Sequence, residues 1–144
     1  MSVRAAIWGE KAEAIEESLK AVDEDLFRYI RDFAYEEVLA RPGLDLKTRE
    51  LLAITALIAL GSPKELATHL EGALRVGATE REVRETILQS ALFLGFPRAL
   101  AALNLAQKVE RGGGAARVEG GRGARWEARR KRDQEIVAAW DAGQ

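Results

Sequence analysis

The segment covering residues 45–60 is the most apolar part of the chain, and its length and boundaries are those of a helix. Six of its last ten residues are leucine or isoleucine. They fall on all sides of a helix and leave no wet face. Gly61 follows directly and is a typical stop residue. We therefore expect this segment to be the central helix of a helical core.

Helix-start signals recur after this segment. Ser62, Pro63 and Glu65 have the order of an N-cap, a proline in the first turn and a capping-box acid, and Thr79 with Glu82 repeats the capping box. These signals predict helices over residues 62–76, 79–94 and 97–110. Because these helices are short and joined by tight turns, we expect an antiparallel helical bundle.

Two more helices are expected before this group. The first covers residues 9–22, and the second begins after Asp23, whose carboxylate can cap free backbone donors. Residues 40–43, Ala-Arg-Pro-Gly, then break the chain. No sustained alternation of β-branched and polar residues indicates a strand, so the sequence predicts an all-α fold.

The composition changes near residue 112 and divides the chain into three parts. We expect a helical domain at residues 1–112, a Gly-rich linker at 113–123 and a basic C-terminal helix at 124–144. Six glycines lie between residues 111 and 123, a composition typical of flexible linkers. The last part should dock on the body or on another subunit, because a lone short helix is marginal in water.

Several classes of function are excluded or disfavoured by composition. Cysteine is absent, which excludes disulfides, thiolate nucleophiles and zinc-thiolate sites. The glycine run at residues 112–114 follows a helix and enters no strand–turn–helix context, so it is not expected to bind phosphate, and we expect no cofactor. Without an apolar signal segment or a membrane span, the cytoplasm is the expected location.

The distribution of charge disfavours nucleic acid as a partner of the helical domain. Residues 1–110 carry 14 basic and 18 acidic side chains, whereas residues 111–144 carry 8 and 5. Nucleic-acid binding depends on neutralising phosphates, which an acidic body does not do. Binding through the basic tail remains an alternative, although a solvated or subunit-docking face is the simpler interpretation.

His69 is the only histidine in the chain and the most evident candidate for acid–base chemistry. Glu65 lies four residues earlier, one helical turn away, where its carboxylate could hold the imidazole in place. The simpler interpretation is that His69 is a partly buried helix residue and Glu65 only a capping-box member.

Glu50 is the third candidate, because on the apolar helix it shares a side with Ile54 and Leu57. A carboxylate in such a partly desolvated position is typical of catalytic acids. It could equally pair with Lys47 at the helix start. The side chains of Glu50, Glu65 and His69 also offer two carboxylates and an imidazole, so a divalent metal is a further alternative, although we expect none.

Five short motifs, taken in order, resemble the carboxymuconolactone decarboxylase family over about residues 41–110. They are Gly-Leu-Asp at 43–45 with Thr-Arg-Glu at 48–50, Glu-Leu at 65–66 with His69, Leu-Arg-Val-Gly-Ala-Thr at 74–79, Glu-Val-Arg-Glu at 82–85, and Gly-Phe-Pro-Arg-Ala at 95–99. The resemblance implies a bundle of the alkylhydroperoxidase D-like type that assembles into an oligomeric ring, commonly a trimer or hexamer.

The family implies one of two chemistries. One branch decarboxylates 4-carboxymuconolactone, and the other reduces peroxides with a cysteine pair flanked by a glutamate and a histidine. That second pattern falls here on Glu50, Ser62, Glu65 and His69, so both sulfurs are missing. Thiol–disulfide exchange is therefore excluded, whereas decarboxylation needs only an acid or base and a group that holds the carboxylate.

The sequence thus predicts a C–C lyase of a small anionic lactone, with His69, Glu65 and Glu50 as catalytic residues. In this scheme His69 is the acid or base and Glu65 orients it, while Glu50 is a second carboxylate in the pocket. Arg49, Arg75 and Arg98 are candidates by type for holding substrate carboxylates. The alternative is a non-catalytic homo-oligomer that binds a small acid or a protein partner.

Overall fold

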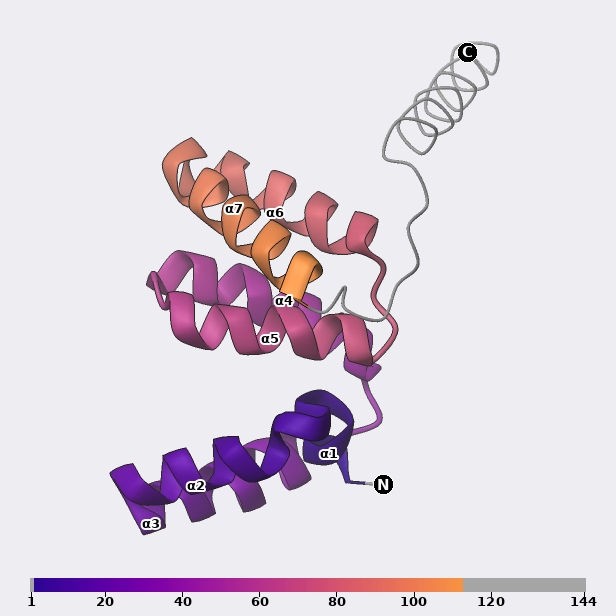
Figure 1. Ribbon diagram of the computed structural model, residues 1–144. Helices are drawn as coiled ribbons and strands as arrows, with labels where there is room; N and C mark the ends of the chain where they lie inside the picture. The colour runs from indigo at the N-terminus through magenta and orange to yellow at the C-terminus, as the bar shows by residue number, and fades with distance from the viewer. Residues whose placement is uncertain (1, 113–144) are drawn as a thin grey trace. The chain divides into compact units, whose positions relative to one another are not determined.

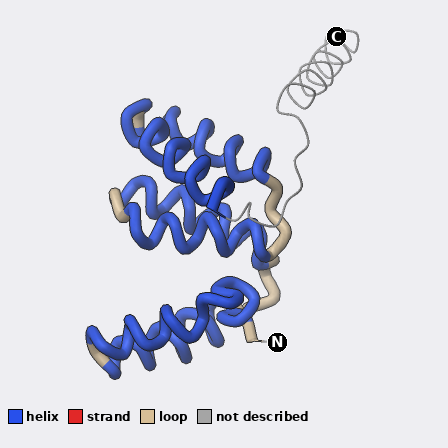
Figure 2. Tube along the Cα trace, viewed as in Figure 1, coloured by secondary structure: helices blue, strands red, loops and turns tan. Residues whose placement is uncertain are grey.

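The computed structural model describes residues 2–112, and every regular element among them is helical, as expected. The order is α1 (Val3–Trp8), η1 (Gly9–Lys11), α2 (Ala12–Val22), α3 (Glu24–Arg28), η2 (Tyr29–Val38), α4 (Leu46–Leu60), α5 (Pro63–Arg75), α6 (Glu80–Leu94) and α7 (Phe96–Gly112). The predicted linker and the predicted C-terminal helix lie outside the described residues. Figures 1 and 2 show this order of helices.

Helices α4 to α7 form two helical hairpins that pack on each other (Figure 1). Helix α4 contributes Ile54 and Ile58 to their shared core, and α7 contributes three buried alanines at positions 99, 102 and 106. Small side chains allow close approach of α7 to its neighbours, while the branched side chains fill the remaining space. The most apolar helix, α4, contacts α5, α6 and α7, which agrees with its predicted central position.

The N-terminal part differs from the single helix predicted over residues 9–22. The helical path begins at Val3, where the Ser2 hydroxyl accepts a hydrogen bond from the Ala5 amide, and α1 ends at Trp8 with Gly9 as its C-cap. Gly9 has a φ of 56°, a conformation that favours glycine over other residues. The chain then turns through η1 into α2, so a glycine expected to open a helix instead separates two.

The second predicted helix does follow Asp23, and its cap is confirmed because the Asp23 carboxylate accepts from the Leu26 amide. After α3, however, the backbone winds as a π-helix over η2. At its end the Leu39 amide donates to the Ala34 carbonyl, five residues back, at 2.9 Å. Such stretches are rare and usually short.

The predicted helix caps of the bundle are confirmed in part. Thr79 and Glu82 form the full capping box at the start of α6. The capping box predicted at Ser62 is wrong, since its side chain makes no capping hydrogen bond and Pro63 alone supports the start of α5. Within residues 2–112, none of the helices is long and apolar enough to cross a membrane.

Candidate active site

Glu50 is a fully buried acid on the core-facing side of α4. It lies four and eight residues before the buried Ile54 and Ile58, so all three side chains point to the interior. Its exposed fraction is 0%. A carboxylate that is removed from water in this way needs a hydrogen-bonding partner.

His69 of α5 provides that partner. Its Nδ1 lies 2.9 Å from Oε2 of Glu50, and its side chain keeps an exposed fraction of 20%. When Glu50 is ionised, the Nδ1–H group donates to it, and this fixes the tautomer in which Nε2 carries a free lone pair. The packing of α4 against α5 thus produces an oriented imidazole whose other nitrogen is available for proton transfer.

The second carboxylate oxygen of Glu50, Oε1, is buried and has no hydrogen-bond partner among the described residues. An unsatisfied buried acceptor is destabilising by about 1–3 kcal/mol. Most buried polar atoms in native proteins have a hydrogen-bond partner, so an exception calls for an explanation. Glu50 is for this reason a candidate functional residue.

Residues of the N-terminal helices pack next to Glu50 and its neighbours on α5. Ile7 of α1 is fully buried and lies against Gly72 of α5. Beside it, Trp8 Nε1 donates a 2.9 Å hydrogen bond to the hydroxyl of Tyr35 on η2. Burial raises the pKa of Tyr35 to about 12, the Trp8 hydrogen bond opposes this rise, and the negative charge of Glu50 adds to it. Tyr35 is thus a neutral group close enough to Glu50 to sense its charge.

Three arginine side chains hold α1 and the ends of other elements through backbone carbonyls. Arg75 donates to the Ile7 carbonyl, Arg98 to the Ile58 and Ala59 carbonyls, and Arg49 to the Leu44 and Arg41 carbonyls. These are the three candidates for holding substrate carboxylates. In this structure their guanidinium groups stabilise helix and turn ends.

The structure brings together two of the three predicted catalytic residues. Glu50 contacts His69, whereas Glu65 is exposed on α5 and makes no hydrogen bond to the imidazole. The carboxylate that holds His69 thus comes from a different helix than the spacing within α5 suggested. Ser62, at the other position matched to a sulfur, is the residue preceding α5.

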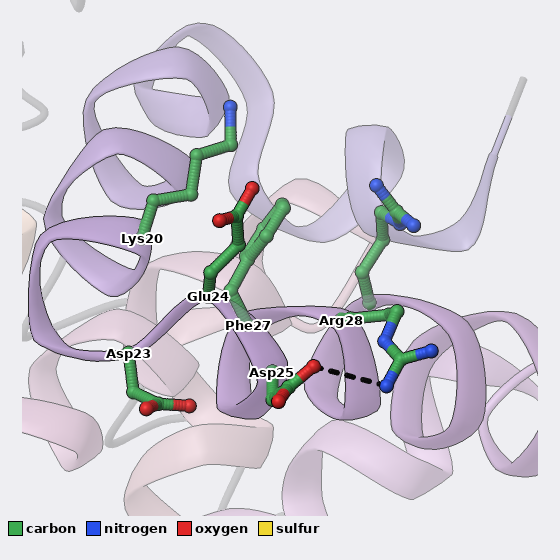
Figure 3. A pocket seen from close by; sticks show the side chains of 7 residues that line it. Lys20, Asp23, Glu24, Asp25, Phe27 and Arg28 are labelled. Carbon is green, nitrogen blue, oxygen red and sulfur yellow. Dashed lines mark hydrogen bonds and ion pairs between the residues drawn. The ribbon is translucent and has the colours of Figure 1, made fainter.

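Two surface pockets within residues 2–112 are lined by neither Glu50 nor His69. One, of about 390 Å³, lies at the turn between α2 and α3, where Asp25 pairs with Arg28 (Figure 3). The other, of about 550 Å³, lies beside the start of α4 and the end of α5 and is lined in part by Lys47. No group of three or more His, Asp or Glu side chains within residues 2–112 is arranged to hold a metal ion.

Sequence reasoning missed Gly72, Ile7 and Tyr35 as parts of the site's surroundings. Gly72 carried a signal, because a glycine inside a helix is unfavourable unless close packing requires it. Ile7 and Tyr35 carried none, since each is an ordinary apolar or aromatic residue whose neighbours are remote in sequence. Their positions follow from how α1 packs on α5 and how η2 packs on α1.

The sequence of this chain is similar to one protein family and to several known proteins. The model of the carboxymuconolactone decarboxylase family matches residues 24–108, more of the N-terminal side than the motifs had indicated. The 4-carboxymuconolactone decarboxylase of Acinetobacter baylyi is 38% identical over 110 residues, which are 76% of this chain and 82% of the relative. A nitrosuccinic acid decarboxylase of Metarhizium robertsii is 39% identical over 80 residues, 56% of each chain.

A third relative, an uncharacterized 15.0 kDa protein of Paracoccus denitrificans, is 46% identical over 71 residues, 48% of this chain and 53% of the relative. The family match spans more than half of the chain and includes both Glu50 and His69. On these grounds the chain belongs to the carboxymuconolactone decarboxylase family.

Proposed function

We propose that this protein is a cysteine-independent decarboxylase, a C–C lyase acting on a small anionic substrate of the carboxymuconolactone type. The observation that carries the proposal is the contact between buried Glu50 and partly exposed His69, which leaves Nε2 available. The names of two relatives, both decarboxylases, support the same class of reaction.

The chemistry required is within the capacity of this pair. In decarboxylation of a lactone acid, the bond between the carboxylate carbon and the skeleton breaks, CO₂ leaves, and the electron pair passes into the conjugated lactone. A proton must then be added to the carbon skeleton. Nε2 of His69 can first take up a proton from solvent and then deliver it to this carbon, while Glu50 stabilises the transient imidazolium through Nδ1, a division of roles typical of carboxylate–histidine pairs.

Glu65 has a secondary place in the proposal. It lies one turn before His69 on the solvent side of α5, so it would act on the approach to the site rather than by orienting the ring. No cofactor and no metal take part in the proposed steps.

We further propose that the protein assembles with copies of itself into a trimeric or hexameric ring of alkylhydroperoxidase D-like bundles. Large apolar side chains are exposed at the junction of α6 and α7, among them Leu92, Phe93 and Phe96 with exposed fractions of 79%, 81% and 79%. Several large exposed apolar side chains on neighbouring turns are typical of interfaces. A neighbouring subunit would also be a source of cations for the substrate carboxylates, since Arg49, Arg75 and Arg98 are engaged by backbone carbonyls.

The assembly is tested by light scattering after size exclusion. Phe93→Ser combined with Phe96→Ser should give a smaller species than the wild type, whereas Leu44→Ser, an exposed apolar residue in a turn, should not. A wild-type protein that is monomeric at micromolar concentration would contradict the proposal.

The reaction is tested by CO₂ release from 4-carboxymuconolactone and from nitrosuccinic acid. His69→Gln and Glu50→Gln should each lower kcat/KM by about 10²–10⁴-fold, the usual contribution of acid–base catalysis. Glu65→Gln should have a smaller effect, and the exposed Glu85→Gln on α6 is the matched neutral control. Full activity in His69→Gln would refute the mechanism.

A non-catalytic family member that binds a small acid or a protein partner is the second candidate. The observation in its favour is that all three candidate arginines are engaged by backbone carbonyls. Wild type that releases no CO₂ from either acid but binds a dicarboxylate, as measured by calorimetry, would favour this function.

A further inference from the structure

Gly72 occupies an unusual place for a glycine. It lies in the interior of α5, is buried, and has an ordinary helical conformation that any residue could adopt. A glycine in a helix interior is less stable than alanine by about 0.5–1 kcal/mol. Its presence therefore has to be explained by what surrounds it rather than by its backbone.

The surroundings leave no room for a side chain. A Cβ at position 72 would lie 2.8 Å from Oε2 of Glu50 and 2.6 Å from Cγ2 of Ile7, and 3.5 Å from the Ile7 carbonyl oxygen. The first two distances are shorter than real Cβ contacts. Even one methyl group would therefore displace Glu50, Ile7 or both.

The oxygen in question is the one that contacts the imidazole. Oε2 of Glu50 is 2.9 Å from Nδ1 of His69, and His69 precedes Gly72 by three residues on the same face of α5. Oε2 of Glu50 thus occupies the space that a side chain at Gly72 would fill, and from there it contacts the imidazole of His69, one turn earlier on α5.

We propose that Gly72 is a positioning residue of the site, whose missing side chain allows Glu50 to reach His69 and fix the Nδ1–H tautomer. Its catalytic consequence rests on the proposed decarboxylase function. The structural part, that Gly72 sets the Glu50–His69 contact, does not depend on which reaction is catalysed.

The two displaced neighbours would respond differently. Ile7 belongs to the six-residue helix α1, whose Ile7 carbonyl accepts a 3.0 Å hydrogen bond from Arg75. Because α1 is short and lies near the N-terminus, we expect it to shift more readily than the central helix α4. Glu50 is fully buried on the central helix. A methyl group at position 72 is therefore expected to move the carboxylate away from α5 and break its contact with the ring.

The direct test uses ¹⁵N-labelled histidine, because the single imidazole gives unambiguous ring resonances. In the wild type, the Nδ1 and Nε2 shifts should report one fixed tautomer with a protonated, hydrogen-bonded Nδ1. Gly72→Ala should give the averaged shifts of a mobile ring. Its kcat should fall by about 10²-fold, the loss associated with a misplacement of about 1 Å, with little change in KM.

Two further variants separate positioning from stability. Ile87→Val removes one methyl group from a fully buried residue of α6, which costs about 0.5–1.5 kcal/mol without touching the site. It should keep the wild-type ring shifts and kcat. Ile7→Ala combined with Gly72→Ala relieves the contact with α1 but keeps the contact with Glu50, so it should still show the mobile ring.

The outcomes are distinct. If Gly72→Ala keeps the wild-type ring shifts, the proposal is overturned. It is also overturned if the double variant recovers the wild-type ring shifts, because the effect of Gly72→Ala would then come from its contact with α1. If the wild type releases no CO₂ from either acid, the decarboxylase function fails, whereas the ring shifts still decide the role of Gly72.

Discussion

Replacing Tyr35 with phenylalanine removes one hydroxyl from the cluster that covers the site. That hydroxyl accepts the 2.9 Å hydrogen bond from Trp8 Nε1, and both side chains are almost fully buried. The variant leaves the indole N–H without a partner in a site that water does not reach. Such an orphaned donor costs about 1–3 kcal/mol in the free energy of unfolding, or a decrease in Tm of about 4 °C for each kcal/mol.

The decrease in the free energy of unfolding of Tyr35→Phe should also depend on pH. Tyr35 has a pKa of about 12 in the folded protein against the ordinary 10.0. The folded pKa is the higher one, so the folded protein favours the neutral form of Tyr35. The stability that the neutral hydroxyl gives the wild type is fully present below pH 10 and is lost as the pH rises through about 12. The difference amounts to roughly 3 kcal/mol in the free energy of unfolding. Wild type and Tyr35→Phe should therefore differ near neutral pH and converge at high pH.

The assay is urea unfolding followed by far-ultraviolet circular dichroism at pH 8, 10 and 11.5, at one protein concentration for both proteins. Circular dichroism is preferred because the chain has three tryptophans, which would mix in fluorescence. Equal stability of the two proteins at pH 8 would refute the argument from the Trp8–Tyr35 hydrogen bond. A stability difference that stays constant up to pH 11.5 would refute the argument from the burial of the Tyr35 hydroxyl.

Three further substitutions test helix ends, each by its urea midpoint. Thr79→Ala removes the capping hydroxyl of α6 and should cost about 1 kcal/mol, whereas Thr79→Ser should cost much less. Gly61→Ala places a side chain at a φ of 70° and should cost about 1 kcal/mol, with Gly61→Asn milder. Arg98→Ala removes the donor to the Ile58 and Ala59 carbonyls and should cost at most about 1 kcal/mol; no change in midpoint would show that solvent replaces it.

The helical class and most of the bundle could be predicted from sequence because their signals are local. A cap at Asp23 or Thr79 depends on an amide three residues away, and the periodic apolar residues of α5 to α7 set the faces that pack. The predictions were wrong where the backbone conformation, rather than the type of residue, decides the local structure. Ser62 has the composition of a cap, but its backbone at φ −108° and ψ 80° is not the extended conformation of the capping residues Asp45 and Thr79.

Of the residues in the candidate site, only Glu50 and His69 could be predicted from the sequence. Glu50 and His69 were found from residue type and from the spacing of a known family, whereas Glu65 was chosen as the partner because it is one turn away on the same helix. Contacts within a helix can be inferred from spacing, but the contact with Glu50 spans 19 residues and depends on how α4 packs on α5. Gly72 and Tyr35 become significant only through such long-range packing.

The π-helical winding of η2 has a consequence for chain length. In this stretch the backbone ladder is closed by donors that reach five residues back, as from Leu39 to Ala34, where an α-helix would reach four. Deleting one residue between them would allow the same carbonyl to be reached with α-helical winding. We therefore expect η2 to tolerate the loss of one residue between Ala34 and Leu39 with that hydrogen bond kept, so a gap here in a sequence comparison need not signal a different fold.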